Sequence, residues 1–241
     1  MSELTNQERK IMEFNQYTQL SDNKPENSFY DFIKINAEEI KNKIIELKNN
    51  AKNLKDYDIR IGFVYPLSVV IDEKIKELCC LKYPRFDGRN ESCSGITDKR
   101  KGCPPYSPKV EDTIKVLKNS TVFLIMQFEK ITDAIIQKYI HGFTVKVERL
   151  LSEKYNILNT YCCGPCRVCA DGCAVEADCR FPDIRRFALE SCGFWVNKLC
   201  EKAAENTIYG DNNWKIEWVK NYGLPSQMPK EFKSVSGILI R

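Results

Sequence analysis

The sequence predicts an α/β or α+β fold, with a single central sheet, flanking helices and cysteine-rich metal-binding loops. Three observations lead to this prediction. Apolar runs of strand length alternate along the chain with segments whose apolar residues recur every three to four positions, as in folds that pack helices on a sheet. The 241 residues are 43% hydrophobic, which is enough for one sizeable core. Finally, most of the 12 cysteines fall in two segments that carry loop signals.

These observations also predict the domain organisation. Residues 1–30 are polar and lack steady periodicity, so we expect an N-terminal arm. Residues 31–241 are expected to form a single metal-binding domain. Its cysteine-rich loops would cover residues 79–106 and 162–182.

The first predicted helix covers residues 33–54, where apolar residues recur in steps of four and three. Asn36 and Glu39 have the spacing of an N-terminal cap. The run IRIGFVY (59–65) then predicts a strand, and a short helix is expected to open near Asp72.

The middle of the chain begins with a polar segment, Lys82 to Gly102, that predicts a long loop. Long loops inside compact domains are usually functional or disordered. Ser107 followed by Pro108 is expected to start the next helix. The apolar run TVFLIMQF (121–128) predicts a central strand buried on both faces. An apolar stripe from Ile136 to Leu150 predicts a second amphipathic helix.

The last part of the chain predicts a strand at Ile157 to Cys162 and a helix from Trp195 to about Asn206. Further strands are expected at WKIEWV (214–219) and VSGILI (235–240). The pattern leaves the order of strand pairing open. No GxGxxG or P-loop motif is present, so nucleotide binding has no support.

Charge and hydropathy restrict the classes of partner. Lys and Arg total 37 against 33 Asp and Glu, and a net charge of +4 makes a nucleic-acid partner unlikely. No apolar run approaches the roughly 20 residues that span a bilayer, and the N-terminus lacks a signal-peptide pattern, so we expect a cytoplasmic protein and no membrane partner. In a reducing compartment the cysteines are expected to bind metal rather than each other. His141 is the single histidine, so the metal would be held mainly by sulfur.

The most specific motif is C-x2-C-x3-C-x5-C, formed by Cys166, Cys169, Cys173 and Cys179. Four thiolates separated by short turns can wrap one inorganic centre, and such compact runs are typical of iron–sulfur clusters. A compact all-cysteine zinc loop is the alternative. Nearby arginines could be solvated surface residues or could offset the charge of a cluster; these are Arg167, Arg180, Arg185 and Arg186.

A weaker constellation joins Cys93 and Cys103 with Cys79 or Cys80 upstream. Cys103 stands just before the predicted helix start, where partial positive charge and free N–H groups favour a thiolate or a bound anionic cluster. We expect Cys103 to belong to a second site close to the first. The alternative is an unligated thiol in a surface turn.

Four other cysteines and the histidine are expected to be mainly structural. Cys200 falls on an apolar helical stripe, and Cys192 is also expected in the core. Cys162 and Cys163 should point to opposite faces of a strand, so at most one would face a cluster. His141 lies off the apolar stripe of its helix and is expected to be exposed.

Five segments carry a recognisable pattern: CPPYSPKVEDT (103–113), HGFTVKVERLL (141–151), GPCRVC (164–169), DCRFPDIRR (178–186) and ESCGFWVN (190–197). They resemble a prokaryotic cysteine-rich family of predicted metal-binding proteins. The resemblance covers about residues 59–240 and implies cytoplasmic metal binding, as iron–sulfur, through the cysteines of both constellations. Where the family is expected to have a further cysteine before Cys93, this chain has Arg89, and Cys79 or Cys80 could substitute for it. The predicted ligands are therefore Cys166, Cys169, Cys173, Cys179, Cys80, Cys93 and Cys103.

Together these features predict an iron–sulfur protein in redox chemistry with one or two [4Fe–4S] clusters. It would transfer electrons, or act as an oxidoreductase or lyase at a cluster with an open iron. Its partner would be a redox protein or a small-molecule substrate. A zinc-stabilised binding module and an accessory protein of RNA or sulfur modification are the alternatives. The reaction and the oligomeric state are left open.

Overall fold

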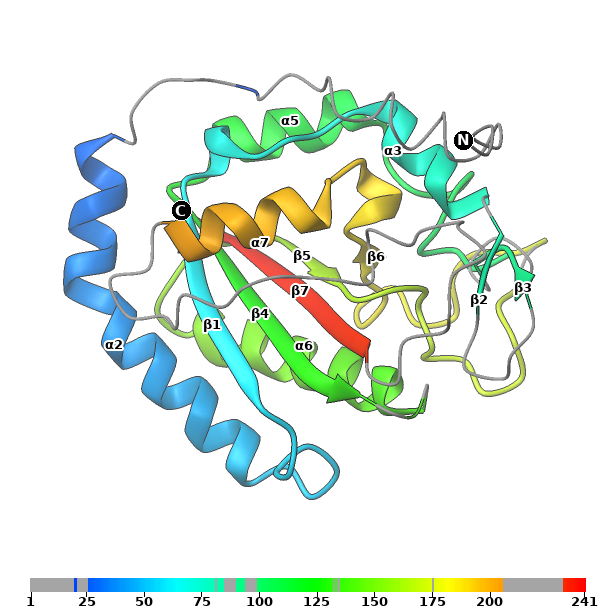
Figure 1. Ribbon diagram of the computed structural model, residues 1–241, viewed down its shortest axis with the longest axis horizontal. Helices are drawn as coiled ribbons and strands as arrows, with labels where there is room; N and C mark the ends of the chain where they lie inside the picture. The colour runs from blue at the N-terminus through cyan, green and yellow to red at the C-terminus, as the bar shows by residue number, and fades with distance from the viewer. Residues whose placement is uncertain are drawn as a thin grey trace, which may run out of the picture.

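A mixed five-stranded sheet with the strand order β1-β4-β7-β5-β6 forms the centre of the protein (Figure 1). All neighbouring strands are antiparallel except β5 and β6, which are parallel. The computed structural model describes residues 20, 26–80, 82–84, 90–93, 99–131, 133, 135–174, 176–205 and 232–241. The strands are β1 (Ile59–Val64), β4 (Val122–Ile131), β5 (Ile157–Cys162), β6 (Phe187–Ala188) and β7 (Phe232–Ile240).

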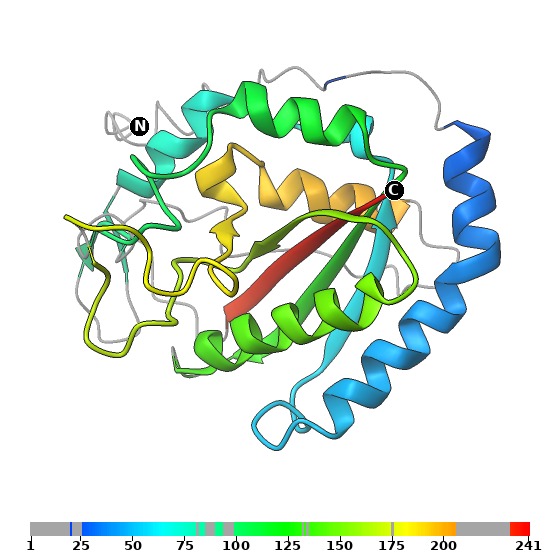
Figure 2. The same ribbon diagram turned by 180° about the vertical axis from the view of Figure 1, so that it is seen from behind.

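Helices cover both faces of this sheet, which confirms the predicted α/β architecture. α2 (Asn27–Asn49) and α6 (Ile136–Ser152) pack on one face, and α5 (Val110–Lys118) and α7 (Val196–Glu205) pack on the other (Figures 1 and 2). Successive residues of a strand point to opposite faces. Accordingly Leu124 and Met126 join the core under α2 and α6, while Phe123 and Ile125 join the core under α5 and α7. The prediction that this strand is buried on both faces is therefore confirmed.

The first helix begins earlier than its sequence pattern predicts. α2 starts at Asn27, and the predicted cap at Asn36 is wrong, because Asn36 lies inside the helix and its Nδ2 donates a hydrogen bond to the carbonyl of Phe32 at 3.0 Å. The extra turns are stabilised by Phe29, which is fully buried. Its ring packs edge-on against Tyr65, with ring centroids 5.7 Å apart. Burial of an aromatic side chain in the first turn thus extends the helix.

α5 begins at Val110, after the expected start at Ser107 and Pro108. The backbone N–H of Val110 donates to Oε1 of Glu73, 2.8 Å away on the short helix α3 (Glu73–Glu77). This carboxylate takes the place of a local capping side chain and also suits the positive end of the helix dipole. Helix α3 therefore fixes where the segment after Cys103 becomes helical.

The connection from β4 through α6 to β5 joins two parallel strands that are separated by β7. The strand β7 thus occupies the middle of the sheet, between β4 and β5, which both lie much earlier in the chain. The predicted strand at 235–240 lies within β7, and the one at 214–219 lies outside the described residues. Short 3-10 turns complete the order: η2 (Pro66–Ser68), η3 (Leu78–Cys80) and η4 (Glu190–Cys192).

The two cysteine-rich segments meet at one end of the molecule, beside the β6 side of the sheet (Figures 1 and 2). Within the predicted loop 82–102, β2 (Tyr83–Pro84) and β3 (Asn90–Glu91) form a small antiparallel pair. In the part of the chain that is described, none of the helices combines the length and apolar character needed to cross a bilayer.

Candidate metal centre

Four half-buried cysteines line one small pocket at this end of the molecule. They are Cys166, Cys169, Cys173 and Cys179. Arg100 and Lys101 from the other cysteine-rich segment line the same pocket. All twelve cysteines of the chain are free thiols. The structure thus brings together the set that the spacing predicts for one site.

Turns and arginine contacts shape the segment that carries these four cysteines. Gly164 and Gly172 have φ values of 58° and 86°, a left-handed conformation that favours glycine. The Arg180 guanidinium donates a hydrogen bond to the carbonyl of Gly172. Nε of Arg167 donates to Oε1 of Gln137 on α6 at 3.2 Å. These two arginines organise the cysteine segment and attach it to the helix.

The other segment supplies hydrogen bonding and positive charge to the pocket. The backbone N–H of Lys101 donates to Sγ of Cys173 at 3.4 Å. Arg185 also lines the pocket, and its guanidinium lies 4.7 Å from the ring centroid of Phe187. N–H donors and cations around thiolates stabilise their negative charge.

A second set of cysteines is more deeply buried. Cys79, Cys93 and Cys103 have exposed fractions of only 5%, 8% and 2%. The N–H of Cys93 donates to the carbonyl of Cys79 at 3.3 Å. Burial raises the pKa of the Cys79 thiol, and the neighbouring Cys93 raises this pKa further. Cys80 is exposed. The structure therefore places Cys79, rather than the adjacent Cys80 named from the sequence, beside Cys93.

Cys103, a member of this second set, also lies close to Cys166 of the first set. Burial raises its pKa, and Cys93, Glu190 and Cys166 raise this pKa further. A Cβ atom built on the preceding residue, Gly102, would lie 3.1 Å from the Cβ of Cys166. The backbone before Cys103 is thus packed directly against the first cysteine set, so the two sets adjoin.

The protonation state of these thiols limits what they can do. Burial raises the pKa of Cys166 as well, and the charges of the other three pocket cysteines add to this effect. Thiols with raised pKa values are protonated at neutral pH and are poor nucleophiles. A bound metal holds such groups as thiolates, and its binding releases their protons. The arrangement suits metal ligation better than thiol catalysis.

His141 contradicts the prediction of an exposed helix residue, because only 4% of it is exposed. Its face of α6 is covered by the segment after Cys179, where Nε2 lies 2.9 Å from the carbonyl of Ile184. Burial lowers the pKa of His141, so the ring is neutral at pH 7 and Nε2–H donates to that carbonyl. The spacing rules consider only an apolar stripe and therefore miss a polar face that binds a loop.

An ion pair makes a second attachment two helical turns later on the same face of α6. Nε and Nη2 of Arg186 each lie 2.6 Å from a carboxylate oxygen of Glu148. Both side chains are largely buried, with exposed fractions of 14% and 20%. The seven-residue separation of His141 and Glu148 is the signal that could have indicated this docking face.

The remaining cysteines belong to the core. Cys192 and Cys200 are fully buried in the cluster between the sheet and α7, as predicted. Cys163 joins the opposite cluster, under α2 and α6. Burial raises the pKa of Cys163 to about 11 and that of Cys192 to about 12.

A family described as predicted metal-binding protein (DUF2284) matches residues 74–239. No curated protein and no solved structure matches the chain. The matched range includes both cysteine sets and the docking face of α6.

Proposed function

The chain belongs to the family of predicted metal-binding proteins (DUF2284), and on that premise we propose that it is an iron–sulfur protein that takes part in redox chemistry. One observation carries the proposal: four cysteines in a compact motif line a single pocket together with Arg100 and Lys101. Compact cysteine runs are the usual ligands of iron–sulfur clusters, whose negative charge suits a cationic surrounding. The ligands of the first centre would be Cys166, Cys169, Cys173 and Cys179.

The order of the cysteines along the chain favours a cluster over one zinc ion. Structural zinc sites usually pair two C-x2-C units across a longer gap, whereas the C-x2-C-x3-C-x5-C run is compact, as in iron–sulfur proteins. Within the described ranges, no group of three or more Cys, His, Asp or Glu side chains is already placed to hold a metal ion, so binding of either kind of centre would have to draw the thiols together.

The neighbouring groups would then have defined roles. The Lys101 N–H, which donates to Sγ of Cys173, would reduce the negative charge at that sulfur. Arg100, Lys101 and Arg185 would favour the reduced, more negative state and so raise the reduction potential. When bound, the cluster supplies one-electron redox chemistry.

A second centre would be held by Cys93, Cys103 and one cysteine of the pair Cys79 and Cys80. We favour Cys79, because its thiol is buried beside Cys93 whereas Cys80 is exposed. Three thiolates would leave one iron of a four-iron cluster without a protein thiol. That iron would be the position where a small-molecule substrate binds, and the protein would then be an enzyme rather than an electron carrier.

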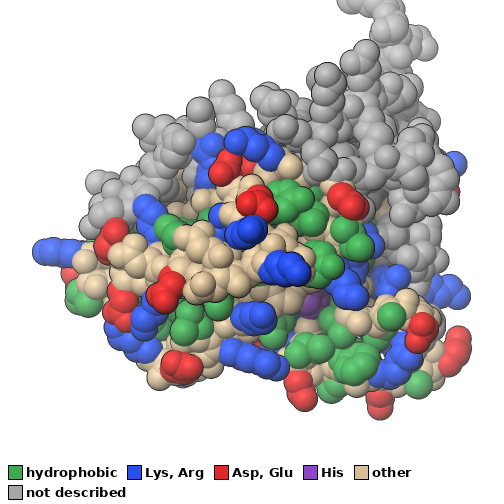
Figure 3. All heavy atoms as spheres, turned by 90° about the horizontal axis from the view of Figure 1, so that it is seen from below, with side chains coloured by type: hydrophobic (Ala, Val, Ile, Leu, Met, Phe, Trp, Pro, Cys, Tyr) green, Lys and Arg blue, Asp and Glu red, His purple; other side chains and the backbone are tan. Residues whose placement is uncertain are grey.

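The alternative functions have weaker support. A zinc-stabilised binding module would use the same cysteines, but structural zinc sites usually pair two C-x2-C units across a longer gap. A role in RNA or sulfur modification would be favoured by a continuous basic surface, yet on the face drawn in Figure 3 Lys and Arg side chains are interspersed with acidic and apolar ones. A redox protein or a small substrate is therefore the partner we propose.

Iron and sulfide analysis of anaerobically prepared protein tests the first centre. Cys169→Ala should lose iron and sulfide together, because it removes a proposed ligand. Cys200→Ala is the matched control, since this thiol is fully buried away from the pocket. Stoichiometric zinc without sulfide in the wild type, or equal losses in both variants, would refute the proposal.

Iron counting also tests the second centre. Two four-iron clusters give about eight irons per chain, and Cys103→Ala should reduce this to about four. Cys80→Ala should leave the count unchanged if Cys79 is the ligand. If Cys103→Ala keeps its iron content and its spectrum, the second centre is refuted, and the protein is an electron carrier with one centre.

A further inference from the structure

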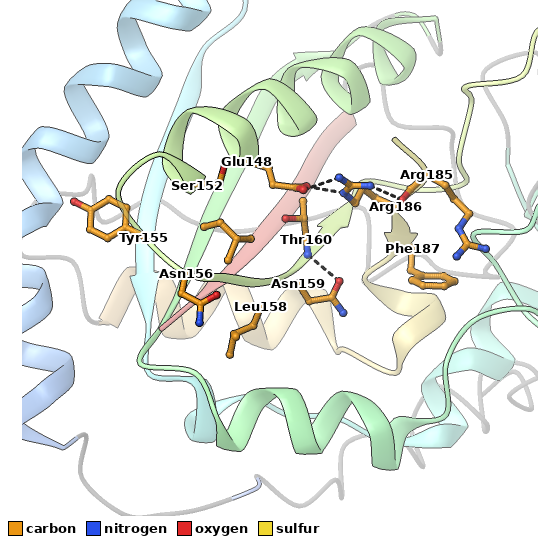
Figure 4. A pocket seen from close by; sticks show the side chains of 11 residues that line it. Glu148, Ser152, Tyr155, Asn156, Leu158, Asn159, Thr160, Arg185, Arg186 and Phe187 are labelled. Carbon is orange, nitrogen blue, oxygen red and sulfur yellow. Dashed lines mark hydrogen bonds and ion pairs between the residues drawn. The ribbon is translucent and has the colours of Figure 1, made fainter. Parts of the chain in front are cut away.

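A second pocket, of about 450 Å³, lies along the outer edge of β5 (Figure 4). It is formed by the C-terminal end of α6, the turn from α6 to β5, the β5 residues 157–160 and the residues 185–187 that lead into β6. β6 pairs only with Tyr161 and Cys162, so the pocket opens where β6 leaves β5 uncovered. Its volume is in the range of sites that bind small molecules.

Two polar atoms of the pocket lining lack partners among the described residues. They are Oγ1 of Thr160 and Nε of Arg185. Thr160 is only 2% exposed, so its hydroxyl has little access to bulk water. Buried polar atoms are nearly always hydrogen-bonded, and each exception needs an explanation. A ligand that brings hydrogen-bonding groups into the pocket would explain both.

The charges of the side chains in the pocket indicate the charge of this ligand. The charge of Arg186 is already balanced by Glu148 through the bidentate ion pair. Arg185 has no ion pair in the described part of the chain, and its guanidinium stacks on Phe187. One unbalanced guanidinium favours a ligand with one negative charge. A dianion such as phosphate would keep one negative charge without a partner in the pocket.

The side chains that line the pocket indicate the chemical class of the ligand. A planar guanidinium matches a carboxylate through two parallel hydrogen bonds. Ile157, Leu158 and Phe187 supply apolar surface for the body of a ligand. In Figure 4, Arg185 and Phe187 lie at one end of the pocket and Thr160 lies farther along it, so the ligand would need a second polar group.

An added β-strand is the other possible occupant of a sheet edge. The backbone N–H of Thr160, however, already donates to Oδ1 of Asn159 at 2.9 Å. This side chain therefore takes the place that a carbonyl of an added strand would need. The edge is protected against strand addition, while the pocket beside it stays open.

We propose that this pocket binds a small organic monocarboxylate that carries a hydroxyl or carbonyl group, with the carboxylate on Arg185 and the second group on Thr160. None of the residues that line this pocket is a proposed metal ligand, although a cluster in the cysteine pocket would share the positive charge of Arg185. Arg185 lines both this pocket and the cysteine pocket. A bound acid would therefore lie next to the cysteine site.

Titration calorimetry with a panel of monocarboxylic hydroxy- and oxo-acids tests the site. The panel contains lactate, 2-oxobutyrate, 4-hydroxybenzoate and 4-hydroxyphenylacetate, each beside its neutral amide, with inorganic phosphate and an extended peptide as further probes. At least one acid should bind saturably, and its amide should bind at least about tenfold more weakly, because it lacks the charge that pairs with Arg185. Absence of saturable binding by every acid, equal binding of acid and amide, or binding of only phosphate or peptide would overturn the proposal.

Variants identify the residues that hold the acid. Arg185→Gln should weaken binding by about 10- to 100-fold, and Arg185→Lys should lose less because it keeps the charge. Lys52→Gln is the control, since it removes an exposed cation in the turn that leads into β1, the strand at the opposite edge of the sheet. Unchanged affinity in a folded Arg185→Gln variant would overturn the assignment.

Thr160→Val separates a ligand role from a structural one. Removing an unpartnered buried hydroxyl should leave the free energy of unfolding unchanged or raise it, whereas affinity for the bound acid should fall about three- to tenfold. The deoxy analogue of the bound acid, which lacks the hydroxyl or oxo group, should bind equally to this variant and to the wild type. A loss of stability with unchanged affinity would show that Thr160 has only a structural role.

Discussion

Gly102→Ala is the substitution that most directly tests how the two cysteine segments pack together. A Cβ atom at this position would lie 2.9 Å from the backbone oxygen of Arg186 and 3.1 Å from the Cβ of Cys166. The backbone cannot easily move away, because the Gly102 carbonyl accepts hydrogen bonds from the N–H of Ala188 at 3.2 Å and from Oγ of Ser191 at 2.9 Å. The added methyl group must therefore displace one cysteine segment from the other.

The expected cost follows from two opposing effects. Overpacking of this kind costs about 1–3 kcal/mol, and the smaller conformational entropy of the unfolded alanine chain returns about 0.4–1 kcal/mol. We expect the free energy of unfolding to fall by about 1–2 kcal/mol, together with a loss of bound metal. Urea unfolding monitored by circular dichroism, with metal analysis of the same samples, measures both quantities.

Gly142→Ala is the matched control. A Cβ atom on Gly142 would meet nothing within 4 Å, and the residue lies inside α6. Alanine there should stabilise the protein by up to about 1 kcal/mol through its higher helix propensity. If Gly102→Ala is as stable as the wild type and keeps its metal, the close packing of the two segments is refuted.

Three further predictions concern the attachment of the cysteine segment to α6. Arg186→Met and Glu148→Gln should each lower the free energy of unfolding by about 1.5–3 kcal/mol, and the double variant should lose less than the sum; additive losses in a denaturation cycle would contradict the ion pair. Because burial lowers the pKa of His141, the unfolded chain binds a proton that the folded chain does not, so stability should fall as the pH drops below about 6.5. His141→Gln should flatten this dependence in unfolding experiments across pH, and an equal slope in both proteins would contradict the buried neutral ring. Chelation should speed hydrogen exchange first in residues 164–182 and only later in α6. Uniform acceleration would mean that the metal stabilises the whole core.

The sequence pattern alone was enough to predict those helices and strands whose buried residues recur at a regular interval. The predicted strand at Ile157 to Cys162 coincides with β5, and the apolar stripe from Ile136 to Leu150 lies within α6. The four cysteines of the compact motif from Cys166 to Cys179 line one pocket, as their spacing predicts, because short turns keep them close together. In each case the deciding contacts lie within about twenty residues.

Features set by distant contacts could not be predicted in this way. The start of α5 depends on the carboxylate of Glu73, and burial of His141 depends on a loop some forty residues later. Cys79 and Cys80 are adjacent in a 3-10 turn, so periodicity gives no reason to prefer one of them. Only the position of Cys93 beside this turn distinguishes the buried thiol from the exposed one.

The central position of β7 sets a time order for the synthesis of this protein. Residues 232–240 must be made before the sheet can close, because β7 supplies the hydrogen-bonding partners of both β4 and β5. Every cysteine precedes this strand in the chain. During translation the thiols therefore leave the ribosome before the sheet beside them can close.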